Sequence, residues 1–290
     1  MLQYIEAKSI LSKLRQQDSF FGIAYNMNIY RGCQHGCIYC DTRSECYGVG
    51  DISKIAVKKN YLELLTQELS SKRKNRGTIG TGSMNDPYMP VERELQFIRK
   101  ALMEIARQRF PVHIITKSEL VTRDTDIIKE ISKIYAAVSI TITTPHDVLS
   151  KKIEPNAPPS SHRFKALGHL AKNGIYTGVT LMPVLPYITD KKEDITTLVR
   201  KAKDAGASYI IPMFGTTMRK GSRDYYYNML EKEFPGLREQ YEINYRDSYE
   251  CFSPHYKSLN EVFRKFINEL NISSRMQFYN PAVNEQLSLF

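Results

Sequence analysis

The 290-residue sequence predicts one α/β domain, built as a partial barrel of six parallel strands with helices between them. After residue 20, short apolar and β-branched stretches alternate with stretches of helical periodicity, the pattern of repeated βα units. The length also suits one barrel-sized domain better than two equal ones. The expected strands are 23–29, 78–82, 112–116, 136–142, 176–182 and 208–213.

Three of the intervening helices can be recognised, two of them by their ends. Ser160 is expected to cap a helix that stops at Gly174, and Asp194 precedes a second helix that stops at Gly206. A third helix is expected within residues 91–109. All three carry apolar side chains at intervals of three and four, so each is expected to pack one stripe against the core.

The strands and helices also suggest how the chain is divided. An N-terminal segment precedes the barrel, a C-terminal helical extension follows it, and a polar stretch near Asn280 and Pro281 leads into a tail. The expected ranges are 1–20 for the segment, 21–215 for the partial (β/α)6 barrel of TIM type, 216–272 for the extension and 273–290 for the tail.

Composition limits the class of protein. Lys and Arg outnumber Asp and Glu by 41 to 31, and the resulting charge of +10 favours a polyanionic partner such as nucleic acid. Outside one cysteine-rich loop only Cys46 and Cys251 remain, which is not a disulfide framework and is typical of a reducing compartment. With no apolar leader and no apolar run near 18 residues, we expect a cytoplasmic protein without a membrane segment.

The most informative segment is the loop at 30–46, directly after the first expected strand. Cys33, Cys37 and Cys40 are separated there by three and then two residues. A four-iron cluster normally takes four cysteine thiolates, so three in one loop leave one iron open to an outside ligand. The alternative is a closed zinc site with Cys46 or His35 as fourth ligand. Such sites usually combine two ligand pairs, and the sequence has no second C-x-x-C.

This spacing, with Tyr39 directly before the last cysteine, resembles the signature of radical S-adenosylmethionine (radical SAM) enzymes. The resemblance implies a [4Fe-4S] cluster on the three cysteines, with S-adenosyl-L-methionine (SAM) bound to the open iron and Tyr39 beside its adenine. It implies reductive cleavage of SAM to a 5′-deoxyadenosyl radical and a flavodoxin- or ferredoxin-type reductant. The six-strand incomplete barrel of that family agrees with the strand count.

Three further segments resemble the spore photoproduct lyase-like branch, whose members are often described as DNA repair photolyases. These segments are Asp86-Pro-Tyr-x-Pro-x-Glu92, residues 154–158 and residues 183–186. The resemblance implies damaged DNA as the favoured substrate and a set of residues that contact SAM. The implied contacts are Ser83, Asp86, Ser139, Thr141 and Arg163. Glu92 has two interpretations, as part of this site or as a first-turn residue favoured by the helix dipole.

One position departs from that branch. True spore photoproduct lyase has a cysteine at the end of its second strand that returns a hydrogen atom to the product radical, and Met84 occupies the matching place here. A thioether has no S–H hydrogen, so spore photoproduct itself is expected as substrate only if Cys46 or Cys251 supplies one. Lys117, at the end of the third strand, is expected to face the substrate.

The tail ends in Gln286, Leu287, Ser288, Leu289 and Phe290, which resembles the bacterial sliding-clamp-binding peptide. In that mode an extended peptide fills apolar pockets. The alternative is that these residues fold back onto the barrel.

The sequence therefore favours a radical SAM enzyme acting on damaged DNA. One alternative is a radical SAM modifier of RNA, protein or a small molecule. An alternative of another class is a non-catalytic, metal-containing protein that binds DNA or the clamp.

Overall fold

The computed structural model describes residues 2–281, and its centre is a seven-stranded sheet in the order β10-β9-β8-β7-β6-β3-β2. The six strands expected from the sequence are all present and mutually parallel. They are β3 (Ile23–Met27), β6 (Thr78–Thr81), β7 (Val112–Thr116), β8 (Ala136–Thr141), β9 (Tyr176–Leu181) and β10 (Tyr209–Pro212). The seventh, β2 (Leu11–Lys13), is antiparallel to β3. The α/β prediction is confirmed.

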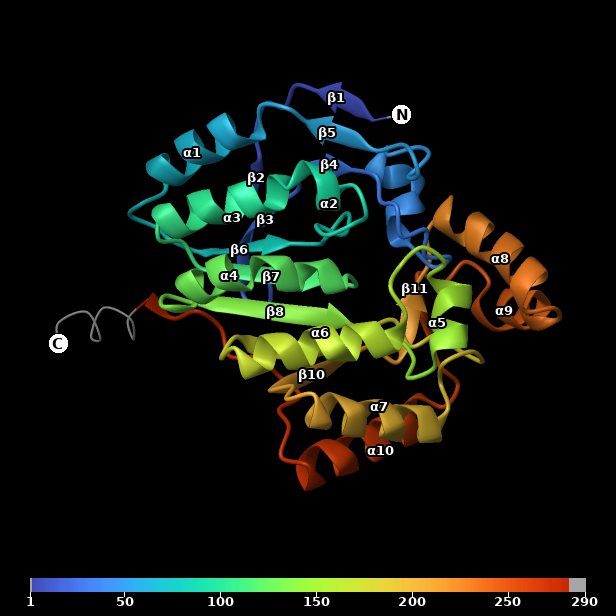
Figure 1. Ribbon diagram of the computed structural model, residues 1–290. Coiled ribbons are helices and arrows are strands. Elements are labelled where there is room, and N and C mark those ends of the chain that lie inside the picture. Colours follow the sequence, from blue (N-terminus) through green and yellow to red (C-terminus); the bar gives the residue numbers. More distant parts are fainter. Residues whose placement is uncertain (1, 282–290) are drawn as a thin grey trace.

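Helices connect the strands and pack against the sheet, as Figure 1 shows. Those between the parallel strands are α1 (Tyr61–Ser71), α2 (Glu92–Leu95), α3 (Phe97–Arg107), α4 (Thr125–Ser132), α5 (Asp147–Ile153), α6 (Ser160–Lys172) and α7 (Lys192–Asp204). Short 3₁₀ turns occur at η1 (Asp41–Arg43), η2 (Glu45–Tyr47) and η3 (Glu119–Asp124). All six residues of β8 are buried, as expected for a parallel strand covered on both faces.

The segments on either side of the barrel are more structured than the sequence indicated. Residues 1–20 contribute β2 and also β1 (Gln3–Ile5), which joins β5 (Ala56–Lys58) and β4 (Tyr30–Arg31) in a small sheet. The extension contains the antiparallel ribbon of β11 (Gly215–Thr217) and β12 (Glu250–Phe252). Its helices are α8 (Ser222–Glu233), α9 (Leu237–Tyr245) and α10 (Tyr256–Glu269).

Three helix boundaries differ from the prediction. Helix α7 begins at Lys192, so Asp194 lies within its first turn rather than before it. The helix expected within 91–109 is broken at Gln96, whose φ of +53° is left-handed, into α2 and α3. The Glu92 carboxylate accepts hydrogen bonds from the amides of Phe97 (3.0 Å) and Ile98 (3.1 Å), which caps α3 at the break. Ser160 is the first residue of α6 rather than its cap, and its hydroxyl donates to the carbonyl of Thr144 (2.7 Å).

The parallel strands all point toward one edge of the sheet. In Figure 1 the arrows of β6 and β8 point to the side where the blue cysteine loop, α5, β11 and α8 gather. In βα barrels the reactive groups lie at this edge, beyond the carboxyl ends of the strands. Within residues 2–281 no helix is both long enough and apolar enough to cross a membrane.

Candidate active site

A cavity of about 330 Å³ lies at the carboxyl edge of the sheet. Cys33, Cys37 and Cys40 all line it. The first two are buried and the third is partly exposed. Their spacing therefore brings three thiols to one cavity, as the sequence predicted. This cavity is the candidate active site.

Two glycines let the backbone form the cavity wall. Gly32, with φ of +87°, precedes the first cysteine, and a Cβ there would lie 2.7 Å from the carbonyl oxygen of Ile52. Gly82 ends β6 with φ of +90°, and a Cβ there would lie 2.2 Å from the carbonyl oxygen of Ile115. Both positions need the left-handed conformation and leave no room for a side chain, so both require glycine.

The last residue of α5 and the segment after it hold the cysteine loop in place. The Ile38 amide donates to the Ile153 carbonyl at 2.9 Å. The Asn156 amide donates to the His35 carbonyl at 3.1 Å, and its side-chain Nδ2 donates to the Gln34 carbonyl at 3.0 Å. Backbone groups of the loop are thus satisfied by residues far away in the sequence, which fixes the shape of the loop between its first two cysteines.

A buried ion pair supports the aromatic residue of the motif. Tyr39 lines the cavity, and its hydroxyl donates to Glu154. Glu154 is completely buried and pairs with Arg163, with 2.5 Å between Oε2 and Nη2. Burial alone would raise the pKa of Glu154, but the positive charges of Arg163 and Lys117 outweigh it and hold that pKa below its usual range.

Arg163 does not line the cavity. Its side chain is completely buried, and besides pairing with Glu154 it donates from Nε to the Pro158 carbonyl (2.8 Å) and from Nη1 to the Thr141 carbonyl (3.0 Å). The expectation that Arg163 contacts SAM does not fit this position, because the guanidinium is already engaged inside the protein.

Of the two candidate residues on β8, one lines the cavity and the other does not. Thr141 lines the cavity, and its hydroxyl is 2.7 Å from that of Thr180. Ser139 is completely buried below the cavity, with its Oγ 2.8 Å from His113 Nε2 and 2.7 Å from the Tyr209 hydroxyl. Direct contact of Ser139 with SAM does not fit this position. Burial lowers the pKa of His113 to about 3, so the ring is neutral.

Ser83 and Asp86 both line the cavity, as expected from the second strand end. Ser83 is exposed, whereas the Asp86 carboxylate accepts from the Thr116 hydroxyl (2.6 Å) and the Lys117 amide (2.6 Å) and lies 3.1 Å from His35 Nε2. Burial raises the pKa of Asp86, but the His35 ring and these hydrogen bonds together hold it below its usual range. Asp86 therefore ties the cysteine loop to the end of β7.

Lys117 brings a positive charge to the cavity. It lines the wall, with its Nζ 5.8 Å from the centroid of the Tyr39 ring. Burial lowers the pKa of Lys117, but the neighbouring Cys37 and Glu154 raise it overall, so the ammonium stays protonated. Lys117 forms no ion pair within residues 2–281. An anionic group in the cavity, such as a carboxylate, would complement its charge.

A further part of the cavity wall was not found from the sequence. It is formed by residues from the ends of β9 and β10, from β11 and from the turns after Cys40: Asp41, Thr42, Tyr47, Met182, Pro183, Met213, Thr216 and Thr217. The strand-end rule applied to β9 and β10 would have indicated Met182 and Met213. Nothing in the sequence indicated that β11 folds back to the cavity.

Arg219 joins the C-terminal extension to the turns that follow Cys40. It pairs with Asp41, and it donates to the hydroxyls of Tyr47 (2.9 Å) and Tyr249 (2.7 Å). Ser44 adds a second link, with its Oγ 3.1 Å from that of Ser222 at the start of α8. The extension therefore contacts the loop beside its third cysteine.

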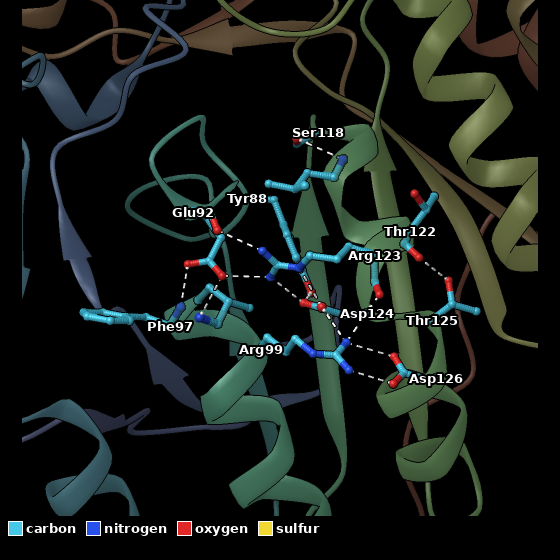
Figure 2. Close-up of polar contacts among 12 residues, drawn as sticks. Tyr88, Glu92, Phe97, Arg99, Ser118, Thr122, Arg123, Asp124, Thr125 and Asp126 are labelled. Carbon is cyan, nitrogen blue, oxygen red and sulfur yellow. Dashed lines mark hydrogen bonds and ion pairs between the residues drawn. The ribbon is translucent and has the colours of Figure 1, made fainter. Parts of the chain in front are cut away.

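Of the two interpretations of Glu92, the structure agrees with the second, in which it is a first-turn residue with a structural role. Figure 2 shows it beside Arg123, whose Nη2 donates to the carboxylate (2.8 Å) while Nη1 donates to the Glu92 carbonyl (2.8 Å). Arg123 also contacts the buried Asp124, which accepts from the Tyr88 hydroxyl (3.0 Å) and from Arg99 (3.1 Å). This network joins α2 and α3 to η3, and Glu92 does not line the cavity.

No fourth cysteine lines the cavity in the described part of the chain. Met84 does line it, as expected from the strand-end position. Cys46 is exposed and lies outside the cavity, and Cys251 is buried with its Sγ donating to the Ser248 carbonyl (3.4 Å). Neither is placed to return a hydrogen atom to a substrate in the cavity.

The donor set fits a [4Fe-4S] cluster better than zinc. Among residues 2–281, no three His, Cys, Asp or Glu side chains come together as ligands of a single ion. An iron–sulfur cubane distributes its cysteines over separate irons, so three thiols around one cavity suit it. Parallel strands with such a loop at their carboxyl edge define an iron–sulfur enzyme with an open ligand position.

Comparison with known proteins identifies the family. Residues 27–211 match the model described as the radical SAM superfamily. An uncharacterised protein of Methanocaldococcus jannaschii is 33% identical over 257 residues, covering 86% of this chain and 85% of its own. A radical SAM Nα-GlyT isomerase of Pseudomonas phage M6 is 25% identical over 182 residues, covering 63% of this chain and 37% of its own.

A solved structure of a spore photoproduct lyase variant, with bound AdoMet and dinucleoside spore photoproduct, has a similar fold. The TM-score is 0.70 at 13% identity, with 93% of this chain and 79% of that chain covered.

The chain belongs to the radical SAM superfamily. It is an enzyme with a [4Fe-4S] cluster and SAM as cofactors, and the non-catalytic alternative is not retained. The residues that would hold the cluster are Cys33, Cys37 and Cys40. When bound, the cluster supplies the electron that cleaves SAM.

Proposed function

We propose that this radical SAM enzyme acts on nucleic acid, with damaged DNA as the favoured substrate. The observation that carries the proposal is the extent of the likeness to spore photoproduct lyase. It covers 93% of the chain, which is more than the family domain at 27–211 spans. The charge of +10 supports a polyanionic substrate.

The cavity residues have distinct roles in this proposal. The cysteines hold the cluster, Lys117 and Ser83 are available to the polar end of SAM, and Thr141 and Tyr39 line the space beside it. The wall of Met213, Thr216 and Thr217 is left for the substrate. Because neither Cys46 nor Cys251 lines the cavity, we propose that the lesion is not spore photoproduct.

Isotope transfer tests the substrate. Anaerobic, reduced enzyme with SAM should form 5′-deoxyadenosine, and Cys37→Ala should abolish it because one cluster ligand is lost. With ultraviolet-irradiated, deuterated DNA, deuterium should appear in the 5′-deoxyadenosine. Undamaged DNA of the same sequence is the matched control. Transfer from RNA or a peptide, and none from damaged DNA, would favour the alternative modifier instead.

The tail supports a second partner proposal, from its sequence alone. Gln286, Leu287, Leu289 and Phe290 lie outside the described residues, and we propose that they bind the bacterial sliding clamp. Immobilised clamp should retain the full chain, and retain it less after removal of residues 286–290. Equal retention would contradict this partner. A flavodoxin- or ferredoxin-type protein is the proposed reductant.

A further inference from the structure

Exposed aromatic rings cluster on β12 and at the start of α10. Tyr249, Phe252 and Tyr256 are exposed to 45%, 44% and 43%. Single exposed rings are ordinary, but these lie within eight consecutive residues, and the Phe252 and Tyr256 rings are in contact with centroids 5.5 Å apart. The Phe252 and Tyr256 rings form one aromatic surface, which we name the ribbon surface, and Tyr249 lies just before β12 against Arg219.

The register of the ribbon connects this surface to the cavity. In the β11–β12 pair, Gly215 lies opposite Phe252 and Thr217 lies opposite Glu250. Alternate residues of a strand share a face, so Phe252 is on the same face as Thr217 and about 7 Å further along. Thr217 lines the cavity. Thr216, on the other face of β11, lines it as well, so the ribbon borders the cavity, and the Phe252 ring lies two positions beyond the exposed Glu250.

Cations lie at both ends of the ribbon surface. At the cavity end the Arg219 guanidinium is 4.3 Å from the centroid of the Tyr249 ring and 5.5 Å from that of Tyr47, itself 38% exposed. At the far end Lys257 is exposed, and with Phe252 and Tyr256 it lines an open hollow of about 810 Å³. Aromatic rings interleaved with cations are the composition of surfaces that bind single-stranded nucleic acid.

We propose that the ribbon surface binds the unpaired nucleotides beside the one that enters the cavity. The inference rests on the proposed function and names the form of its substrate. A base can enter the cavity only after leaving the duplex, so unpaired or unstacked bases lie next to it. Phe252 and Tyr256 offer π-faces on which any base can stack, and the exposed Lys257 attracts the phosphates, whereas Arg219 is already paired with Asp41.

Direct binding tests this surface without relying on turnover. Cluster-loaded enzyme is titrated anaerobically into a short fluorescein-labelled oligothymidylate, and fluorescence anisotropy gives the dissociation constant. A stacked base contributes enough that Phe252→Ala with Tyr256→Ala should weaken binding roughly five- to 150-fold. The matched control is Tyr4→Ala, a ring exposed to 52% on the separate sheet of β1, which should bind like the native enzyme.

A second variant leaves the aromatic rings in place and changes a charge instead. Lys257→Gln changes only an exposed charge, and it should lower the slope of log affinity against log salt by about one. Circular dichroism confirms that each variant is folded. Native enzyme that binds no oligonucleotide would refute the nucleic-acid function itself. Native binding that both the double variant and Lys257→Gln leave unchanged would refute the ribbon surface alone.

Discussion

The substitution Arg163→Met tests how the aromatic side of the cavity is held. It leaves the buried Glu154 carboxylate without its ion-pair partner, with hydrogen bonds only from the Tyr39 hydroxyl and, at 3.4 Å, from Thr143. Lys117 is then the remaining positive charge that acts on it. Removing one member of a buried ion pair costs about 3–5 kcal/mol. The free energy of unfolding should fall by about that amount.

A double variant separates the charge from the packing. Adding Glu154→Gln to Arg163→Met removes the unpaired charge while keeping an acceptor for Tyr39, so it should be more stable than Arg163→Met alone. Urea unfolding followed by circular dichroism measures both. Arg238→Met, which breaks an exposed pair with Glu242 on α9, is the control and should change little. A double variant no more stable than Arg163→Met would refute the reasoning.

Three further predictions concern single positions. Burial lowers the pKa of His113 from 6.5 to about 3, so its contribution to stability is complete above pH 6.5 and is lost by about 1.4 kcal/mol per pH unit below it. Urea midpoints should therefore fall less steeply with acid in His113→Leu than in the native chain, and equal slopes would contradict this. Gly82→Ala should destabilise the fold by about 2–5 kcal/mol in thermal unfolding, because a left-handed residue would meet the Ile115 carbonyl; an unchanged melting temperature would be the contrary result. Asn156→Ala should release iron faster to a chelator while changing unfolding by only about 1 kcal/mol, since it frees the Gln34 carbonyl of the loop; an unchanged release rate, followed by absorbance, would count against it.

The strands and the cysteine loop were predictable because their signals are local. Most of the parallel strands are buried on both faces and therefore read as short apolar runs, and β7 at Val112–Thr116 matches its expected range at both ends. The three cysteines are fixed by their covalent spacing. Placing them at a strand end required only the general rule for parallel βα units.

What could not be predicted depends on contacts between distant residues. The break at Gln96 follows from the Glu92 carboxylate capping α3 while Arg123 holds it, and helical periodicity does not reveal that partner. Arg163 is nine residues from Glu154, but spacing does not show whether a guanidinium turns to a cavity or to a buried carboxylate. The strands β1 and β2 have three residues each, too few for a recognisable pattern.

The residues that hold the cysteine loop in place are synthesised long after the loop itself. Its backbone is held by Ile153 and Asn156, and its far end by Arg219, whereas the thiols themselves emerge early in translation. A nascent chain therefore carries three reactive cysteines for most of its synthesis before the loop can take its final shape. We therefore expect stable cluster loading to follow the synthesis of Arg219, with the three thiols open to oxidation until then.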